Sequence, residues 1–429
     1  MARDGLLIVG AGPAGLALAS KYPGAARILE AADEVGGLCR SIEFGDGVFD
    51  LGGHSFHTPY AEVSQFVERL MGGRWHSQRR DARVSMNGEL IDYPFQTHFM
   101  QLSNAALVAE CREYLPPSGR PSTASDFEEW IVERFGAGIA RHFMLPYNRK
   151  LWARDLKRIA CDWVGERIAE TYSKGAQTAE RGRQPLQSDS WVSYPADGGF
   201  VEIYRAMANL CGPIELSSEV CEIDPINKIA RTCDGRTWPW TRLASTMPLP
   251  GLVRALDGCP ADLIADVDRL ELVSLKVLLI LIGAPLAAQP QRIYLPDPAV
   301  PPHKVAFNHT SSPALRSRPA HAIMGEISYS EEKPARSDAD LQSATLDWLI
   351  DSRLVRSAAD VAEFRVEDIR FAYPVYTHDR PAILARIRAY LEPFGIYSFG
   401  RFGGWDYVNS DACIWQGWNL ASRLAAEGT

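Results

Sequence analysis

Residues near the start of the chain have the types and spacing needed to hold a dinucleotide. Gly10, Gly12 and Gly15 form a GxGxxG pattern, and Glu30 follows 20 residues after the first glycine. Gly10 permits a tight turn, Gly12 lets a diphosphate approach the backbone, and Gly15 allows a helix to pack closely on a strand. The Glu30 carboxylate can accept hydrogen bonds from ribose hydroxyls. Together these residues predict a dinucleotide site.

A second glycine pair, Gly36 and Gly37, lies just beyond this acid and is followed by Leu38. NAD enzymes do not need such a pair, whereas in FAD enzymes it brings the backbone close to the dinucleotide a second time. No other glycine fingerprint occurs downstream, because the sequence around Gly283 lacks the spacing. The single cradle, which also contains Pro13, Ala14 and Ala31, therefore indicates FAD.

The elements around the glycines fit this site. Residues 6–9 are a continuous apolar run, typical of a strand buried in a parallel sheet, and a helix of small residues follows the turn. Residues 99–170 have helical patterns, and after residue 187 strands and turns prevail.

We therefore predict an α/β protein with a Rossmann-like FAD-binding domain assembled from discontinuous segments, an inserted helical domain and an antiparallel β-sheet domain. The predicted boundaries are residues 1–75, 196–247 and 374–429 for the FAD-binding domain, 99–170 for the helical domain, and 76–98, 171–195 and 248–373 for the sheet domain.

Composition excludes several classes of function. The 429 residues carry a formal charge of −8, with 53 acidic and 45 basic side chains and no block of one sign, so nucleic-acid binding is not expected. The eight cysteines form no CxxC pair and have no histidine at ligand spacing, which argues against a metal and fits a reducing compartment. The longest apolar run, 277–288, is too short for a membrane span. We expect a soluble, cytoplasmic protein.

Beyond the glycines, a set of motifs extends over almost the whole chain: Gly10 to Gly15, Gly52 to His57, Asp92 to Gln96, Tyr147 to Trp152, Trp163 to Arg167, Tyr194 to Phe200, Tyr373 to Val375 with Arg380, and Gly400 to Tyr407. In these motifs the chain resembles the UDP-galactopyranose mutases of the amine-oxidase-like FAD superfamily, and in several of them their eukaryotic branch.

This resemblance implies a nucleotide-sugar mutase that interconverts pyranose and furanose rings without net redox change. In the family, N5 of reduced FAD is proposed to attack the anomeric carbon and expel the nucleoside diphosphate, and NADPH or NADH is the candidate reductant. The implied partner is a nucleotide sugar, with uridine diphosphate as the expected carrier. The sequence does not identify the sugar and leaves a homo-oligomer open.

The resemblance also assigns roles to individual residues. It places Arg167 and Lys304 as the clamp on the departing diphosphate, and His54 in a turn that approaches the flavin. At position 304 the family carries Arg; Lys keeps the charge but not the planar fork. Two consequences stay open: the leaving group is held differently, or it is not the usual diphosphate.

The resemblance also implies which residues bind the cofactor and the substrate. A helix beginning near Asn409 and Asp411 is expected to point its positive end at the flavin. The cofactor residues are Gly10, Gly12, Pro13, Ala14, Gly15, Glu30, Ala31, Gly36, Gly37, Leu38, Gly53, His54, Val220, Gly400, Arg401 and Asn409. The substrate residues are Phe56, Tyr93, Phe95, Gln96, Asn148, Trp152, Arg167, Tyr294, Lys304, Tyr373, Tyr407 and Asn409.

Two alternatives stay open. One is an FAD-dependent oxidase or desaturase of the amine-oxidase or protoporphyrinogen-oxidase type, which needs an apolar pocket and has no use for Arg167, Lys304 and a tyrosine-rich diphosphate site. The other is a catalytically silent FAD-binding scaffold, which the clamp and pocket residues argue against.

Overall fold

The computed structural model describes residues 5–113, 115, 122–164, 191–286 and 288–427. Arg167, one of the two predicted clamp residues, lies outside the described residues, as do residues 171–190 of the predicted sheet-domain segment 171–195.

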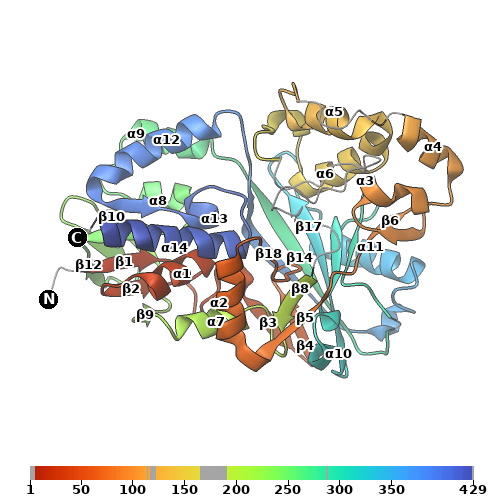
Figure 1. Ribbon diagram of the computed structural model, residues 1–429, viewed down its shortest axis with the longest axis horizontal. Coiled ribbons are helices and arrows are strands. Elements are labelled where there is room, and N and C mark those ends of the chain that lie inside the picture. Colours follow the sequence, from red (N-terminus) through yellow and green to blue (C-terminus); the bar gives the residue numbers. More distant parts are fainter. Residues whose placement is uncertain (1–4, 114, 116–121, 165–190, 287, 428–429) are drawn as a thin grey trace.

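A five-stranded parallel sheet forms the nucleotide-binding side of the molecule (Figure 1). Its order is β19-β13-β1-β2-β9, with β1 Leu6–Val9, β2 Ala26–Leu29, β9 Ile214–Glu215, β13 Arg242–Ser245 and β19 Ile396–Ser398. All four residues of β1 are buried, because helices or strands cover both faces of the sheet. The predicted Rossmann-like unit, assembled from distant segments, is thereby confirmed.

Four helices cover one face of this sheet: α1 Pro13–Lys21, α2 Ala61–Met71, α7 Glu202–Ala208 and α14 Ser410–Ala426. The closest packing is between α1 and α14, where a Cβ added to Gly417 would lie 2.5 Å from the Ala14 carbonyl oxygen. Small residues in both helices thus fix the last helix of the chain beside the first glycine turn.

The other face is covered by a small antiparallel sheet and three helices. The sheet contains β10 Val220–Asp224, β11 Ile229–Thr232 and β12 Thr237–Pro239, and the helices are α8 Leu249–Ala255, α9 Ala261–Asp268 and α12 Arg380–Leu391. Leu252 of α8 and Leu263 of α9 share a core with Leu7 of β1. The predicted start of the sheet domain at residue 248 is therefore too early.

A seven-stranded sheet builds the second half of the molecule, with order β18-β14-β17-β16-β15-β6-β7. All pairs are antiparallel except β15 with β6. The strands are β6 Ala82–Met86, β7 Glu89–Asp92, β14 Leu272–Ile282, β15 Arg292–Tyr294, β16 Lys304–Phe307, β17 His321–Tyr329 and β18 Val361–Pro374.

Helix α11 Asp338–Asp351 packs its Leu341 and Leu349 on one face of this sheet, against Ile280 and Ile323. Shorter elements complete this half: the hairpin β3 Ser41–Phe44 and β4 Gly47–Asp50, the pair β5 Trp75–Arg79 and β8 Trp191–Pro195, and α10 Pro313–Arg316. Helix α13 Gly400–Gly403 belongs to the nucleotide-binding side, where Phe402 shares a core with β1 and α8.

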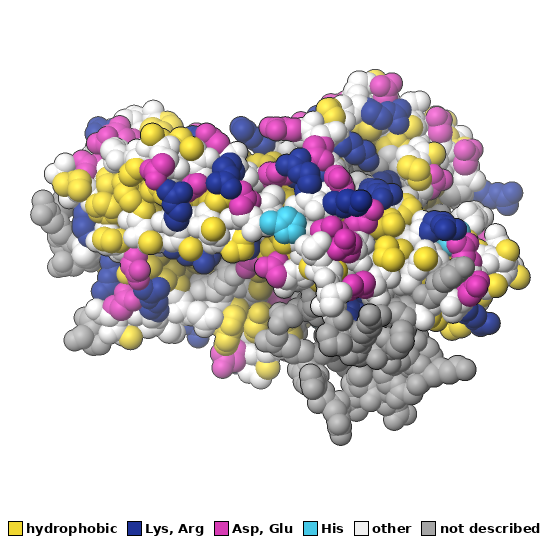
Figure 2. Space-filling model, turned by 90° about the horizontal axis from the view of Figure 1, so that it is seen from above, with side chains coloured by type: hydrophobic (Ala, Val, Ile, Leu, Met, Phe, Trp, Pro, Cys, Tyr) yellow, Lys and Arg dark blue, Asp and Glu magenta, His cyan; other side chains and the backbone are white. Residues whose placement is uncertain are grey.

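The helical insertion lies at the upper right of Figure 1 and packs around a core that it shares with β6 and β7. It contains α3 Phe95–His98, α4 Ala105–Glu113, α5 Phe127–Ile139, a π-helix over Ala140–Met144, and α6 Leu145–Trp152. None of the helices in the described ranges has both the length and the apolar character needed to cross a bilayer. On the face seen in Figure 2, basic and acidic side chains are interspersed over the described residues.

Candidate functional site

A cavity of about 860 Å³ connects the parallel sheet, the seven-stranded sheet and the helical insertion. Residues after β1 and β2 line one end, and residues of α6 and β15 line the other. A cavity of this size is in the range of small-molecule and cofactor sites.

Most predicted cofactor residues line this cavity: Gly10, Gly12, Pro13, Ala14, Glu30, Ala31, Gly37, Leu38, Gly53, His54, Val220, Arg401 and Asn409. Gly15, Gly36 and Gly400 are not among its lining residues. They shape the loops instead. A Cβ on Gly15 would lie 2.0 Å from the Gly10 carbonyl oxygen, while Gly36 and Gly400 have φ values of +111° and +78°.

The Glu30 carboxylate is fixed at the end of β2. Its Oε2 accepts a hydrogen bond from the Ala11 N–H at 2.6 Å, and its Oε1 accepts one from the Ala32 N–H at 2.9 Å. These bonds hold the acid beside the glycine turn, where a ribose would lie next to a bound diphosphate.

The N-terminus of α14 faces the same cavity. Asn409 is the N-cap, and Asn409, Ser410 and Asp411 all belong to the lining. A helix of 17 residues presents partial positive charge and N–H groups at this end. The predicted orientation of this helix towards the cofactor therefore agrees with its place at the cavity.

One face of the seven-stranded sheet supplies the charged wall. Arg292 pairs with Ala306, Tyr294 pairs with Lys304, and Lys304 pairs with Glu326 on the next strand. Because directly opposed residues and residues two apart share a face, these side chains point to one side. Lys304 Nζ lies 2.8 Å from Glu326 Oε1, within the cavity wall.

Glu326 is 2% exposed and is the centre of a hydrogen-bonded cluster. Its Oε1 also accepts the Gly53 N–H at 2.7 Å, and its Oε2 lies 3.4 Å from the Tyr373 hydroxyl and 3.6 Å from His303 Nε2. Burial opposes ionisation, but Lys304 and these donors hold the pKa of Glu326 well below its usual range. Glu326 is therefore a carboxylate paired to the predicted clamp lysine.

His54 is uncharged at neutral pH. Burial lowers its pKa to about 3, with Lys304 and Arg292 contributing in the same direction. The ring stacks on Phe200 with centroids 5.0 Å apart, and Nδ1 lies 4.0 Å from Asp50 Oδ2. Next to a cofactor, His54 offers a neutral ring rather than a cation.

Aromatic side chains close the far end of the cavity. Trp152 packs edge-on against Tyr407 at 5.5 Å and Tyr373 at 6.4 Å, and the Arg401 guanidinium lies 4.8 Å from the Tyr407 ring. Arg401 is held by the carbonyl oxygens of Ala372 and Val408. The indole Nε1 of Trp152 is buried without a hydrogen-bond partner among the described residues.

The predicted base-binding strip also reaches the cavity in part. Tyr93 stacks on Tyr294 with ring centroids 4.2 Å apart, and both line the cavity with Gln96 and Asn148. Asn148 Nδ2 donates to the Met144 carbonyl oxygen at 2.8 Å.

Two predicted substrate residues lie elsewhere. Phe95 is fully buried and stacks on Phe143 at 4.9 Å, and Phe56 packs on Trp75 at 5.6 Å in the core under α2. Neither lines the cavity. Their apolar rings are buried by neighbouring helices and strands, so the prediction that they contact substrate is corrected.

Sequence reasoning missed several lining residues: Arg80, Tyr147, Arg292, His303 and Glu326. For Arg292 and Glu326 a signal exists. Arg292 is two residues before Tyr294 on a strand, and Glu326 is an isolated acid in the apolar run of β17. Arg80 carries no such signal, since it precedes β6 in a polar segment.

Comparison with known proteins agrees with this geometry. Residues 8–70 match the family model of an NAD(P)-binding Rossmann-like domain. A crystal structure of reduced UDP-galactopyranose mutase superposes with a TM-score of 0.89 at 24% sequence identity, covering 99% of this chain and 94% of that chain. The chain has the fold of UDP-galactopyranose mutase. The similarity in fold predicted from the motifs is thereby confirmed.

The same fold occurs in proteins with other activities. Cyclohexylamine oxidase from Brevibacterium oxydans IH-35A is similar at a TM-score of 0.72 and 15% identity, and a CLA-producing fatty acid isomerase from P. acnes at 0.64 and 15% identity, each comparison covering 99% of both chains. Because one fold supports several reactions, the function must be argued from the side chains of the cavity.

Proposed function

We propose that the protein is a flavin-dependent nucleotide-sugar mutase that interconverts the pyranose and furanose forms of a sugar. The observation that carries the proposal is the make-up of the cavity. One end has the glycine turn and Glu30 of a dinucleotide site, and the other has Lys304 and the hydroxyls of Tyr373 and Tyr407. An amine oxidase would need an apolar chamber at that second end.

The residues at the first end fit FAD. Gly12 and Gly37 approach each other closely, with 3.9 Å between a Cβ built on Gly12 and the Gly37 Cα, which leaves bare backbone facing the cavity. Gly12, Glu30, Val220 and the N-terminus of α14 would hold the cofactor. When bound and reduced, FAD supplies the nucleophile that the ring interconversion requires.

The chain's own residues have three tasks in this proposal. Lys304, with Arg167, holds the departing diphosphate and stabilises its charge. Tyr373 and Tyr407 donate hydroxyl hydrogen bonds to the same group. Trp152 closes the chamber, so that water does not compete for the anomeric carbon.

The test is a ring-interconversion assay. Purified protein with FAD is incubated with UDP-galactopyranose or related nucleotide sugars, with dithionite or NADPH as reductant, and the products are separated by chromatography. We expect a furanose product only with the reduced flavin, and we expect Arg167→Ala to abolish turnover while leaving the flavin spectrum intact. Turnover of an amine by the oxidised protein, with peroxide release, would instead identify an oxidase. A protein that cannot bind FAD would contradict both functions.

A further inference from the structure

Two arginines that neither the glycine motif nor the clamp accounts for face the same part of the cavity. Arg292 is the first residue of β15 and pairs with Ala82 of β6 in the parallel pair of these strands. Arg80 lies two residues before Ala82, and both arginines line the cavity. The pairing of these strands brings the two guanidinium groups to one corner, although they are 212 positions apart in the sequence. Burial lowers the pKa of Arg80, and the nearby charge of Arg292 acts in the same direction.

This corner has a net positive charge. Lys304 is neutralised by Glu326, but neither Arg80 nor Arg292 forms an ion pair with any acidic side chain in the described parts of the chain. Nε of Arg80 is buried and has no hydrogen-bond partner there. The buried acid Asp50 is near Arg292, whose charge favours the ionised form of Asp50. Its oxygens accept bonds from Ser41, Tyr194 and the Phe200 N–H, and among the described residues it forms no direct ion pair with either arginine. Burying unpaired cations is costly, so such a corner is suited to an anion that arrives with a ligand.

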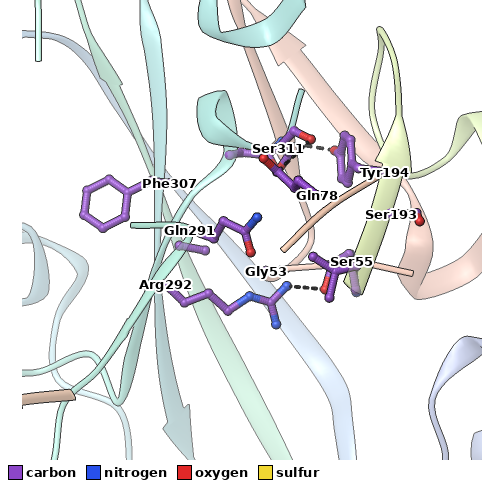
Figure 3. Close-up of a pocket in the computed structure, with 13 residues that line it drawn as sticks. Gly53, Ser55, Gln78, Ser193, Tyr194, Gln291, Arg292, Phe307 and Ser311 are labelled. Atoms are coloured by element: carbon purple, nitrogen blue, oxygen red, sulfur yellow. Dashed lines mark hydrogen bonds between the residues drawn. The ribbon is translucent and has the colours of Figure 1, made fainter. Parts of the chain in front are cut away.

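The position of Arg292 relates this corner to the reacting end of a substrate. Its Nη2 donates to Ser55 Oγ at 2.8 Å, as Figure 3 shows, and Ser55 follows the turn of Gly53 and His54. Arg292 also lines a second, small cavity of about 20 Å³ behind this turn, which has room for about one water molecule. The turn is predicted to approach the flavin, so the sugar that reacts there would lie beside Arg292.

We propose that Arg80 and Arg292 form an anion subsite for an acidic substituent, such as a carboxylate, on the sugar of the nucleotide-sugar substrate. The inference rests on the proposed mutase function and narrows its substrate class to acidic sugars. A neutral hexose offers hydroxyls but no charge to pair with the guanidinium groups, whereas a carboxylate can accept bidentate hydrogen bonds from an arginine.

Calorimetric titration of the FAD-loaded protein tests the subsite with UDP, UDP-galactose, UDP-galacturonate and UDP-glucuronate. We expect at least one UDP-uronate to bind wild type about tenfold or more tightly than UDP-galactose, in line with the strength of charge-assisted hydrogen bonds. Arg80→Gln and Arg292→Gln should each remove most of this preference and leave the affinity for UDP within about twofold, a change below 0.5 kcal/mol by the same conversion. Arg79→Gln removes the same charge from an exposed neighbour and should change nothing.

Three results would overturn the proposal. Equal affinity of wild type for the uronates and UDP-galactose would refute the subsite without any variant, even if the variants fail to fold. If both variants lose affinity for UDP and for the uronates by the same factor, the arginines bind the diphosphate instead. If wild type binds none of the four compounds, the nucleotide-sugar function itself fails, which is distinguishable from binding without preference.

Discussion

The ammonium of Lys304 and the carboxylate of Glu326 form a buried ion pair between neighbouring strands, with Nζ 2.8 Å from Oε1. Glu326 is 2% exposed, so its charge depends on this partner. The pair gives the cavity wall a fixed cation that is already balanced, in contrast to Arg80 and Arg292. A bound diphosphate would therefore share Lys304 with Glu326.

Removing only the cation should damage both the fold and the binding. Lys304→Met leaves a buried carboxylate unpaired, and we expect the free energy of unfolding in urea to fall by about 3–5 kcal/mol. Lys304→Met combined with Glu326→Gln should regain most of that stability, because no uncompensated charge remains. Affinity for UDP should be low in both variants. Recovery of UDP binding in the double variant would show that Lys304 does not hold the nucleotide.

The two glycines of the first turn should respond differently to alanine. Gly12 has φ −78°, which alanine adopts, and a Cβ there meets nothing closer than 3.9 Å. Gly12→Ala should therefore fold normally but bind FAD at least about tenfold more weakly, because the methyl group faces the bound diphosphate. Gly15→Ala should lose stability, because its Cβ would lie 2.0 Å from the Gly10 carbonyl oxygen. Flavin absorbance after gel filtration measures FAD retention, and urea unfolding of the FAD-free proteins measures stability. An equal loss of unfolding free energy in Gly12→Ala and Gly15→Ala would contradict the separate roles of the two glycines.

Lys150 fixes the loop between β15 and β16. Its buried Nζ lies 2.7–2.8 Å from the carbonyl oxygens of Leu295, Asp297, Val300 and Pro302. This loop carries Tyr294 at one end and Lys304 at the other, and Lys150 itself lies on α6 between Asn148 and Trp152. One ammonium thus joins the helical insertion to the charged wall.

Lys150→Met should leave these carbonyl groups without their donor. We expect the free energy of unfolding to fall by about 3 kcal/mol or more, and affinity for UDP to fall as Tyr294 and Lys304 lose their fixed positions. Lys157→Met, at an exposed site a few residues later, is the matched control and should behave as wild type. Unchanged UDP affinity in a folded Lys150→Met protein would mean that the loop keeps its shape without the lysine.

The nucleotide end of the site could be predicted from the sequence because its information is local. The apolar run of β1, the glycine turn and Glu30 lie within 25 residues, and strand, turn and helix each have a direct signal. The parallel sheet and the helical insertion followed from such local patterns as well.

The charged corner could not be predicted, because it depends on which strands pair. Alternation along β15 indicates that Arg292 and Tyr294 share a face, but not that β6 lies alongside and brings Arg80 to the same corner. The presence of an aromatic residue in a motif was also not enough to predict contact with the cavity. Phe56 and Phe95 lie in motifs of the site, yet their rings are buried in the surrounding core.

Asp50 should give the protein a measurable dependence of stability on pH. Burial raises its pKa to about 6, although hydrogen bonds from Ser41, the Phe200 N–H and Tyr194 oppose the shift. Between about pH 4 and pH 6 the folded protein keeps a proton that the unfolded chain has released, so this group's contribution is full below pH 4 and is lost as the pH rises through 6. The lost contribution is roughly 2–3 kcal/mol, at about 1.4 kcal/mol per pH unit.

Asparagine at this position cannot ionise. Asp50→Asn should be less stable than wild type at every pH, because the amide replaces the carboxyl group in its hydrogen bonds. The difference in the free energy of unfolding should shrink by roughly 2–3 kcal/mol between pH 4 and pH 7, because only wild type loses the contribution of the bound proton. Urea unfolding at half-unit pH steps measures the difference. Asp46→Asn, in the exposed turn of the same hairpin, is the control and should follow the wild-type curve. Parallel curves for wild type and Asp50→Asn would mean that Asp50 keeps an ordinary pKa in the folded protein, and that burial under Tyr194 and Phe200 does not hold its proton.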